Sequence, residues 1–209
     1  MSTPSGLRLN LGCGLRHEPG YINVDLYGEP DVRHDLETFP WPWPDNSVAE
    51  IRMVHVLEHL GQSPRVYRDI WKEIYRICAP EAQLQVVVPH YRHENFHSDP
   101  THVRAVTPLG LTLMSQRFNR SWSKAANSPL GLYWEVDFEI VKFTYKPSSD
   151  WFRLHPDGKA DSNLLLAESA IMNNLIEEVT FEMKAIKPPT SKVEGDRAAG
   201  AERKEGPST

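Results

Sequence analysis

The sequence has few cysteines, no strong excess of either charge and no long apolar segment. Its 209 residues contain two cysteines, Cys13 and Cys78, too few for a disulfide framework. The N-terminal MSTPSGLR lacks the apolar segment of a signal peptide, and no run of about 20 apolar residues occurs. A formal net charge of −5 gives no electrostatic support for a nucleic-acid partner. We therefore expect a cytoplasmic protein that binds neither nucleic acid nor membrane.

Two common nucleotide-binding motifs are also missing. A GxGxxG motif that begins at Gly12 requires glycine at position 17, where the sequence has His17. The phosphate-binding motif GxxxxGK[ST] is absent. These absences disfavour hydride transfer by a bound dinucleotide and phosphate binding in a glycine-rich loop.

The last 22 residues carry little that could enter a core. Between Pro188 and Thr209 the only large apolar residue is Val193. Ordering a chain costs roughly 1–2 kcal/mol per residue for the backbone alone. We therefore expect a disordered tail over 188–209 and a single domain over 1–187.

The first half of that domain alternates strands with a helix. Short apolar segments predict strands at 7–12, 22–26, 50–56 and 83–89. Apolar residues at helical spacing predict a helix over 63–78, with Ser63-Pro64 at its start. The segment PWPWPDNS at 40–47 excludes a regular helix there, because proline lacks the N–H group and clashes with the preceding turn. This order indicates a Rossmann-like α/β fold with a mainly parallel sheet.

The pattern changes after residue 90. It predicts helices from Thr107 to about Phe118 and over 163–178, and strands over 136–145 and 179–186. The two late strands are expected to pair antiparallel at one edge of the sheet. We therefore expect residues 7–90 to bind a cofactor and residues 91–187 to supply an acceptor site and the edge strands.

The glycine turn and the acids that follow it favour one cofactor. A glycine turn allows close approach of a ligand to the backbone, and an acid that ends the second strand, Asp25, can accept both ribose hydroxyls. A further acid near the end of the third strand can accept from an adenine amino group. With no phosphate-binding loop, these features match S-adenosylmethionine.

Four successive segments resemble class I S-adenosylmethionine-dependent methyltransferases. They are LRLNLGCG, GYINVDL, HDLETFPWPWPDNSVAEIRMVHVLEHL and IYRICAPEAQLQVVVPH, within residues 7–90. They are most similar to the small-molecule enzymes of the methyltransferase type 11 group. The chain departs from that pattern between LNLG and INVD, where too few residues remain for a full first crossover helix.

This resemblance implies a role for each motif residue. The glycine turn would line the methionine part of the cofactor, Asp25 would hold the ribose, and Asp35 with Leu36 would hold the adenine. Asp31 competes with Asp35 for that place. The expected cofactor-binding residues are Asn10, Gly12, Cys13, Gly14, Asp25, Leu26, Asp35, Leu36 and His55.

Histidines are concentrated near the expected acceptor side. Of the nine histidines, five lie in 55–59 and 89–97, and His102 follows closely. His55 ends one predicted strand and His90 follows the next, so both imidazoles are expected to enter one crevice. A histidine that acts as general base is one interpretation, with His55, His90 and His93 as the catalytic set. The other is a zinc, manganese or iron site formed by His55, Glu58, His59 and His90.

The predicted activity is methyl transfer from S-adenosylmethionine to a small-molecule acceptor. A histidine base favours oxygen or an acidic carbon as the methylated atom, because a free amine needs no base. Two alternatives remain open. One is a non-catalytic protein that binds S-adenosylmethionine, and the other is a metal-dependent enzyme that uses the histidine and glutamate cluster.

Overall fold

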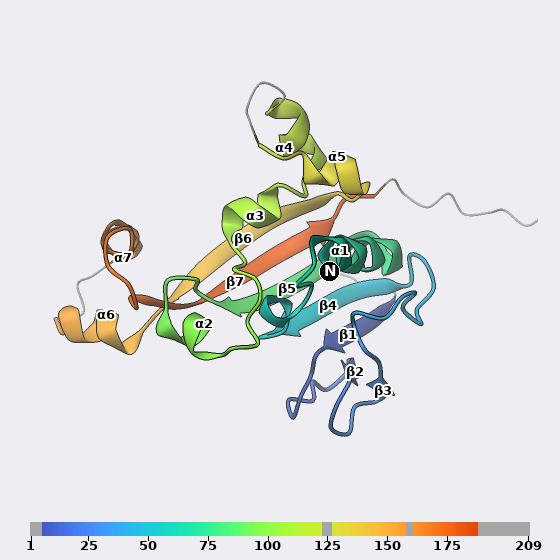
Figure 1. Cartoon of the computed structure of the whole chain (residues 1–209), viewed down its shortest axis with the longest axis horizontal. Coiled ribbons are helices and arrows are strands. Elements are labelled where there is room, and N and C mark those ends of the chain that lie inside the picture. Colours follow the sequence, from blue (N-terminus) through green and yellow to red (C-terminus); the bar gives the residue numbers. More distant parts are fainter. Residues whose placement is uncertain (1–5, 123–126, 158–160, 188–209) are drawn as a thin grey trace, which may run out of the picture.

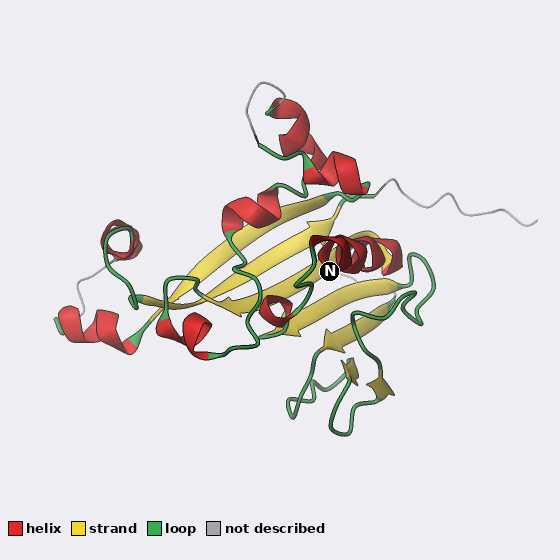
Figure 2. Ribbon diagram, in the orientation of Figure 1, coloured by secondary structure: helices red, strands yellow, loops and turns green. Residues whose placement is uncertain are grey.

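The computed structural model describes residues 6–122, 127–157 and 161–187, which form one seven-stranded sheet with helices around it (Figures 1 and 2). The strand order is β3-β2-β1-β4-β5-β7-β6. Strands β1 to β5 pair in parallel, and β7 is antiparallel to both β5 and β6. The strands are β1 (Leu7–Leu11), β2 (Ile22–Asp25), β3 (Val32–Arg33), β4 (Val48–Val54), β5 (Cys78–Pro89), β6 (Phe138–Pro147) and β7 (Ile176–Ala185). This confirms the predicted Rossmann-like fold and the antiparallel pairing of the last two strands.

The helices of the described residues are mostly short. They are η1 (Leu57–His59, a 3-10 helix), α1 (Pro64–Ile77), α2 (Glu94–Ser98), α3 (Pro108–Thr112), α4 (Gln116–Ser121), α5 (Leu130–Trp134), α6 (Ser149–Leu154) and α7 (Ser162–Ser169). Within the described part of the chain, no helix is long and apolar enough to cross a membrane.

Helix α1 covers one face of the central strands. Its Ile70, Trp71 and Ile74 are fully buried in the same core as Leu9 of β1 and Ile51 of β4. Burying one side chain of this size contributes roughly 1.5–3 kcal/mol, so the apolar stripe holds the helix on the sheet. As predicted, Ser63 caps the helix by accepting from the N–H of Arg65 at 3.3 Å, and Pro64 occupies the first turn.

The opposite face of these strands is polar. Strand side chains alternate between faces, so residues between the buried positions point away from α1. In β4 these are Glu50 and Arg52, and in β5 they are Gln83 and Gln85. The connection between β1 and β2 contains no helix, as the short spacing predicts, and neither do those from β2 to β3 or from β3 to β4.

Two predicted helices differ from the observed ones. The segment from Thr107 to Phe118 is not one helix: α3 ends at Thr112, and Ser115 caps α4 by accepting from the N–H of Phe118 at 3.4 Å. The helix expected over 163–178 stops at Ser169, and β7 begins at Ile176. Residues 176–178 instead belong to β7, which pairs with both β5 and β6. This strand pairing overrides the weak helical pattern there. The prediction of a disordered tail over 188–209 lies outside the described residues.

Candidate functional site

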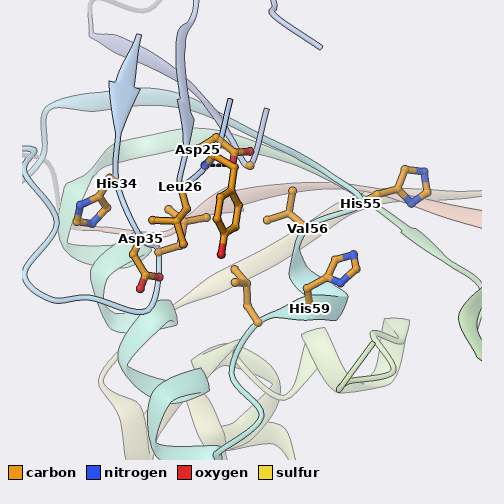
Figure 3. Close-up of a pocket in the computed structure, with 11 residues that line it drawn as sticks. Asp25, Leu26, His34, Asp35, His55, Val56 and His59 are labelled. Atoms are coloured by element: carbon orange, nitrogen blue, oxygen red, sulfur yellow. Dashed lines mark hydrogen bonds between the residues drawn. The ribbon is translucent and has the colours of Figure 1, made fainter. Parts of the chain in front are cut away.

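A cavity lies beyond the carboxyl ends of β1, β2 and β4. Its volume is about 320 Å³, within the range of small-molecule sites. Figure 3 shows the side chains of Asp25, Asp35, His55 and His59 around it. The lining residues are Gly12, Asp25, Leu26, Tyr27, His34, Asp35, Leu36, His55, Val56, His59 and Leu60. Sequence reasoning did not identify Tyr27, His34, Val56 and Leu60, although each lies within five residues of a predicted site residue.

The turn after β1 requires glycine at its first position. Gly12 has φ +64°, and a Cβ there would lie 2.4 Å from Cγ2 of Val56. Gly14 has φ +51°, but no other residue would crowd a Cβ at that position. Glycine at position 12 therefore permits both the left-handed backbone and the close approach of Val56 at the floor of the cavity.

Asp25 ends β2 and is half-buried at the cavity wall. Its Oδ2 accepts from the N–H of Gly14 at 2.8 Å, and its Oδ1 accepts from the N–H of Tyr27 at 2.9 Å. Each carboxylate oxygen can accept a second hydrogen bond. The carboxylate is thus held in place with acceptor capacity left for a ligand.

Asp35 also lines the cavity, next to the buried side chain of Leu36. Its Oδ1 accepts from the N–H of Glu37 at 2.9 Å, and its Oδ2 accepts from Oγ1 of Thr38 at 3.3 Å. The competing acid, Asp31, instead accepts from Asn23 of β2 and is not among the residues around the cavity.

The loop after the glycine turn is tied to the sheet by Asn10. The buried amide of Asn10 donates to the carbonyl of Arg16 and to Oδ1 of Asn23, both at 2.9 Å. Asn10 and Cys13 line a smaller cavity of about 90 Å³ that shares Gly12 with the larger one. Burial raises the pKa of the Cys13 thiol, which disfavours the nucleophilic thiolate.

His55 lies at the cavity between two carboxylates. Its backbone has φ +57°, and its N–H donates to the carbonyl of Val87 in β5 at 2.9 Å. Nδ1 lies 3.4 Å from Oε1 of Glu58, and Nε2 lies 3.1 Å from Oε1 of Glu178. Contact with Glu58, reinforced by Glu178, raises the pKa of His55 despite the opposing effect of burial.

His90 and His93 lie outside the lining of this cavity. His90 is buried against the rings of Tyr91 and Tyr145, and burial, Arg92 and His93 lower its pKa to about 4. Nδ1 of His93 caps α2 by accepting from the N–H of Asn95 at 3.1 Å. The crevice around His55 is therefore lined by His34 and His59 rather than by His90.

Three potential metal ligands converge beside His55. Glu58, His59 and His102 each offer an atom within 4.8 Å of the other two. The set expected from the sequence shares Glu58 and His59 with this group and lacks His102. The N–H groups of Val103 and Arg104 donate to the carbonyl of Glu58, at 2.9 and 3.2 Å, which carries His102 to this place.

Arg104 itself holds this junction together. Its guanidinium stacks on the ring of Tyr67 at 3.9 Å and donates to the carbonyl of Gly61. Gly61 has φ +67°, and a Cβ there would lie 2.6 Å from Cα of Tyr67. The segment around 99–104 is thus fastened to both η1 and the start of α1.

Comparisons with known proteins identify the fold. No protein-family model and no curated protein sequence matches the chain. Among solved structures, a SAM-dependent methyltransferase from Archaeoglobus fulgidus is 19% identical with a TM-score of 0.55, over 86% of this chain and 87% of that one. A SAM-dependent methyltransferase from Methanosarcina mazei is 14% identical with a TM-score of 0.50, over 88% of this chain and 94% of that one. The chain therefore has the fold of the class I S-adenosylmethionine-dependent methyltransferases.

Proposed function

We propose that this protein transfers a methyl group from S-adenosylmethionine to a small-molecule acceptor. The observation that carries the proposal is the cavity with Gly12 at its floor and Asp25 and Asp35 at its wall. In open α/β sheets, ligands bind beyond the carboxyl ends of the strands. This cavity occupies that position in a methyltransferase fold.

We infer which part of the cofactor each residue contacts from the chemistry of the residues that line the cavity. Asp25 accepts the two ribose hydroxyls with the lone pairs that Gly14 and Tyr27 leave free. Asp35 accepts from the adenine amino group, and Leu36 packs against the adenine ring. The methionine part passes the glycine turn, with Asn10, Cys13 and Gly14 at its far side and Leu26 along the ribose.

We expect the methyl group of the bound cofactor to lie near His55. Bound S-adenosylmethionine would supply the methyl group: the acceptor atom would bond to the methyl carbon as the carbon–sulfur bond breaks, the acceptor's proton would pass to the assisting histidine, and S-adenosylhomocysteine would leave with the electrons of the broken bond. Because the sulfonium is already activated, the protein mainly aligns the two reactants in a water-poor site. We assign the acceptor atom to oxygen or an acidic carbon, with a histidine at the cavity as the assisting group. His90 and His93 belong to the predicted catalytic set, but their place outside the cavity makes His55 the principal member.

Calorimetric titration of the purified chain with S-adenosylmethionine and S-adenosylhomocysteine tests the cofactor. We expect micromolar affinity, weakened at least about tenfold in Asp25→Ala, because two hydrogen bonds to the ribose are lost. Glu29→Ala, which removes an exposed acid near β2, is the matched control and should bind normally. A folded chain that binds neither ligand would disprove the proposal.

Product formation separates an enzyme from a protein that only binds the cofactor. The chain is incubated with methyl-labelled S-adenosylmethionine and pools of small hydroxylated, acidic-carbon or amine compounds, and labelled product is identified by mass spectrometry. We expect product from the first two pools and a loss of rate in His55→Gln. An amine product formed at full rate by His55→Ala and His90→Ala would contradict the assignment of a histidine to catalysis.

A further inference from the structure

The carboxylate of Glu58 is buried without hydrogen bonds. Its side chain is 1% exposed, and neither Oε1 nor Oε2 has a hydrogen-bond partner in the described part of the chain. A buried carboxylate in this condition is strongly unfavourable unless a positive charge lies beside it. The site therefore favours a cation beside Glu58.

The neighbouring side chains do not supply a fixed positive charge. The ion-pair partners of Glu58 among the described residues are two histidines, His55 at 3.4 Å and His102 at 4.0 Å. The contact with His55 lacks hydrogen-bond geometry, and the contact with His102 is too long for a hydrogen bond. The nearby guanidinium of Arg104 is directed elsewhere, to Tyr67 and Gly61.

Hydrogen bonds orient both candidate histidine ligands. Nδ1 of His102 lies 2.8 Å from the carbonyl oxygen of Phe96, which can only accept, so Nδ1 carries the proton. Nδ1 of His59 lies 2.8 Å from Oγ1 of Thr101, whose hydroxyl already donates to Asp99. With Nδ1 facing its hydrogen-bond partner, Nε2 of each ring is the atom that can offer a lone pair to a metal ion. Metal-binding histidines typically donate the N–H of their other ring nitrogen to a carboxylate, a backbone carbonyl or water, as His102 does here.

We propose that Glu58, His59 and His102 bind a divalent transition-metal ion. Nε2 of His102, with its lone pair, faces Oε1 of Glu58 at 4.0 Å, so two acceptors confront one another. A tetrahedral zinc ion with bonds of about 2.1 Å holds its ligand atoms about 3.4 Å apart. The three ligand atoms here lie within 4.8 Å of one another, so small side-chain movements would bring them to that spacing. Oδ2 of Asp99 lies 3.9 Å from the same Nε2 of His102, so a further carboxylate oxygen lies near the proposed ion.

The ligand types narrow the choice of metal. Two imidazoles with one carboxylate favour zinc, iron or manganese over calcium or magnesium. Three protein ligands leave a coordination position for water or for an acceptor oxygen. His59 belongs to both the metal group and the cavity wall, so the ion would lie at the edge of the cavity (Figure 3). This role in acceptor binding rests on the proposed methyl transfer, whereas metal binding does not.

Metal binding can be measured directly on the full chain. After treatment with a chelator and its removal, the chain is titrated with Zn²⁺ and with Mn²⁺ by calorimetry, and the reloaded sample is analysed for metal by mass spectrometry. We expect one tight ion per chain, and a loss of affinity of at least about 100-fold in His102→Ala and in Glu58→Gln. His97→Ala, which removes an exposed histidine of α2, is the matched control and should keep its affinity within about twofold.

A second readout guards against variants that fail to fold. Cobalt(II) is added to the metal-free chain, and its visible absorption is expected in the wild type and in His97→Ala but not in folded His102→Ala. A chain that takes up no ion, or equal affinity in all variants, would overturn the proposal. S-Adenosylmethionine titration of the same samples keeps the two proposals distinct, because metal uptake without cofactor binding would disprove only the proposed function.

Discussion

Gly12 and Val56 meet so closely at the floor of the cavity that no side chain fits between them. A Cβ on Gly12 would lie 2.4 Å from Cγ2 and 2.7 Å from Cγ1 of Val56. Distances below 3.0 Å force the backbone or the valine to move. The pair therefore couples the turn after β1 to the start of the segment that carries Glu58 and His59.

Gly12→Ala should lower the free energy of unfolding by about 2–4 kcal/mol. Roughly 1 kcal/mol comes from the left-handed backbone and about 1–3 kcal/mol from overpacking against Val56. Gly14→Ala is the matched control, because its φ is also positive but its Cβ meets open space, so about 1 kcal/mol is expected. Urea denaturation measures both, and equal losses in the two variants would contradict the role of Val56.

Arg76 should be a strong point of attachment for the tryptophan–proline segment. Its guanidinium donates to the carbonyls of Trp41 and Trp43 and pairs with Glu73, which is 13% exposed. Arg76→Met removes the donor to both carbonyls and leaves Glu73 with only the N–H of Trp41, so it should cost about 2–4 kcal/mol. Arg68→Met is the control, because the more exposed Arg68 pairs with neighbouring Asp69, and it should cost less than about 1 kcal/mol. Thermal or urea unfolding that ranks the two variants equally would refute this assignment.

Asn10 should control the order of the loop that replaces the first crossover helix. Asn10→Ala removes its hydrogen bonds to Arg16 and Asn23 and should cost about 1–3 kcal/mol. Hydrogen exchange followed by mass spectrometry should show faster exchange over residues 13–20, with α1 unchanged. Asn163→Ala, in an exposed position of α7, should leave that loop as it is. Unchanged exchange in Asn10→Ala would mean that the loop is held by other contacts.

His90 should make the protein less stable in acid. Its pKa is about 4 in the folded state and about 6.5 in the unfolded chain, so the folded state favours the neutral ring. The contribution of His90 to the free energy of unfolding amounts to about 3 kcal/mol. It is fully present above pH 6.5 and is lost as the pH falls from 6.5 to 4. His90→Asn should reduce the difference in unfolding free energy between pH 7 and pH 4.5 by about 2 kcal/mol. His97→Asn, at an exposed position, should leave that difference unchanged. The same pH dependence in both variants would contradict the lowered pKa of His90.

Local patterns accounted for the elements nearest the cavity. Short apolar segments predicted β1, β2, β4 and β5, and the helical spacing of apolar residues predicted α1, because all five contribute to a shared core. Those patterns failed between α3 and α4 and at the end of α7. There, single capping residues and strand pairing outweighed a weak apolar periodicity.

Short segments and their order along the chain were enough to predict the glycine turn, the acid that ends β2 and the crowding of histidines. Tertiary structure alone decided which histidines meet. His102 lies 44 residues after Glu58 in the chain, yet two backbone hydrogen bonds and the stacking of Arg104 on Tyr67 bring it there. His90, which follows a neighbouring strand, is instead drawn into a separate aromatic environment. Such choices depend on contacts between distant segments, which no local pattern records.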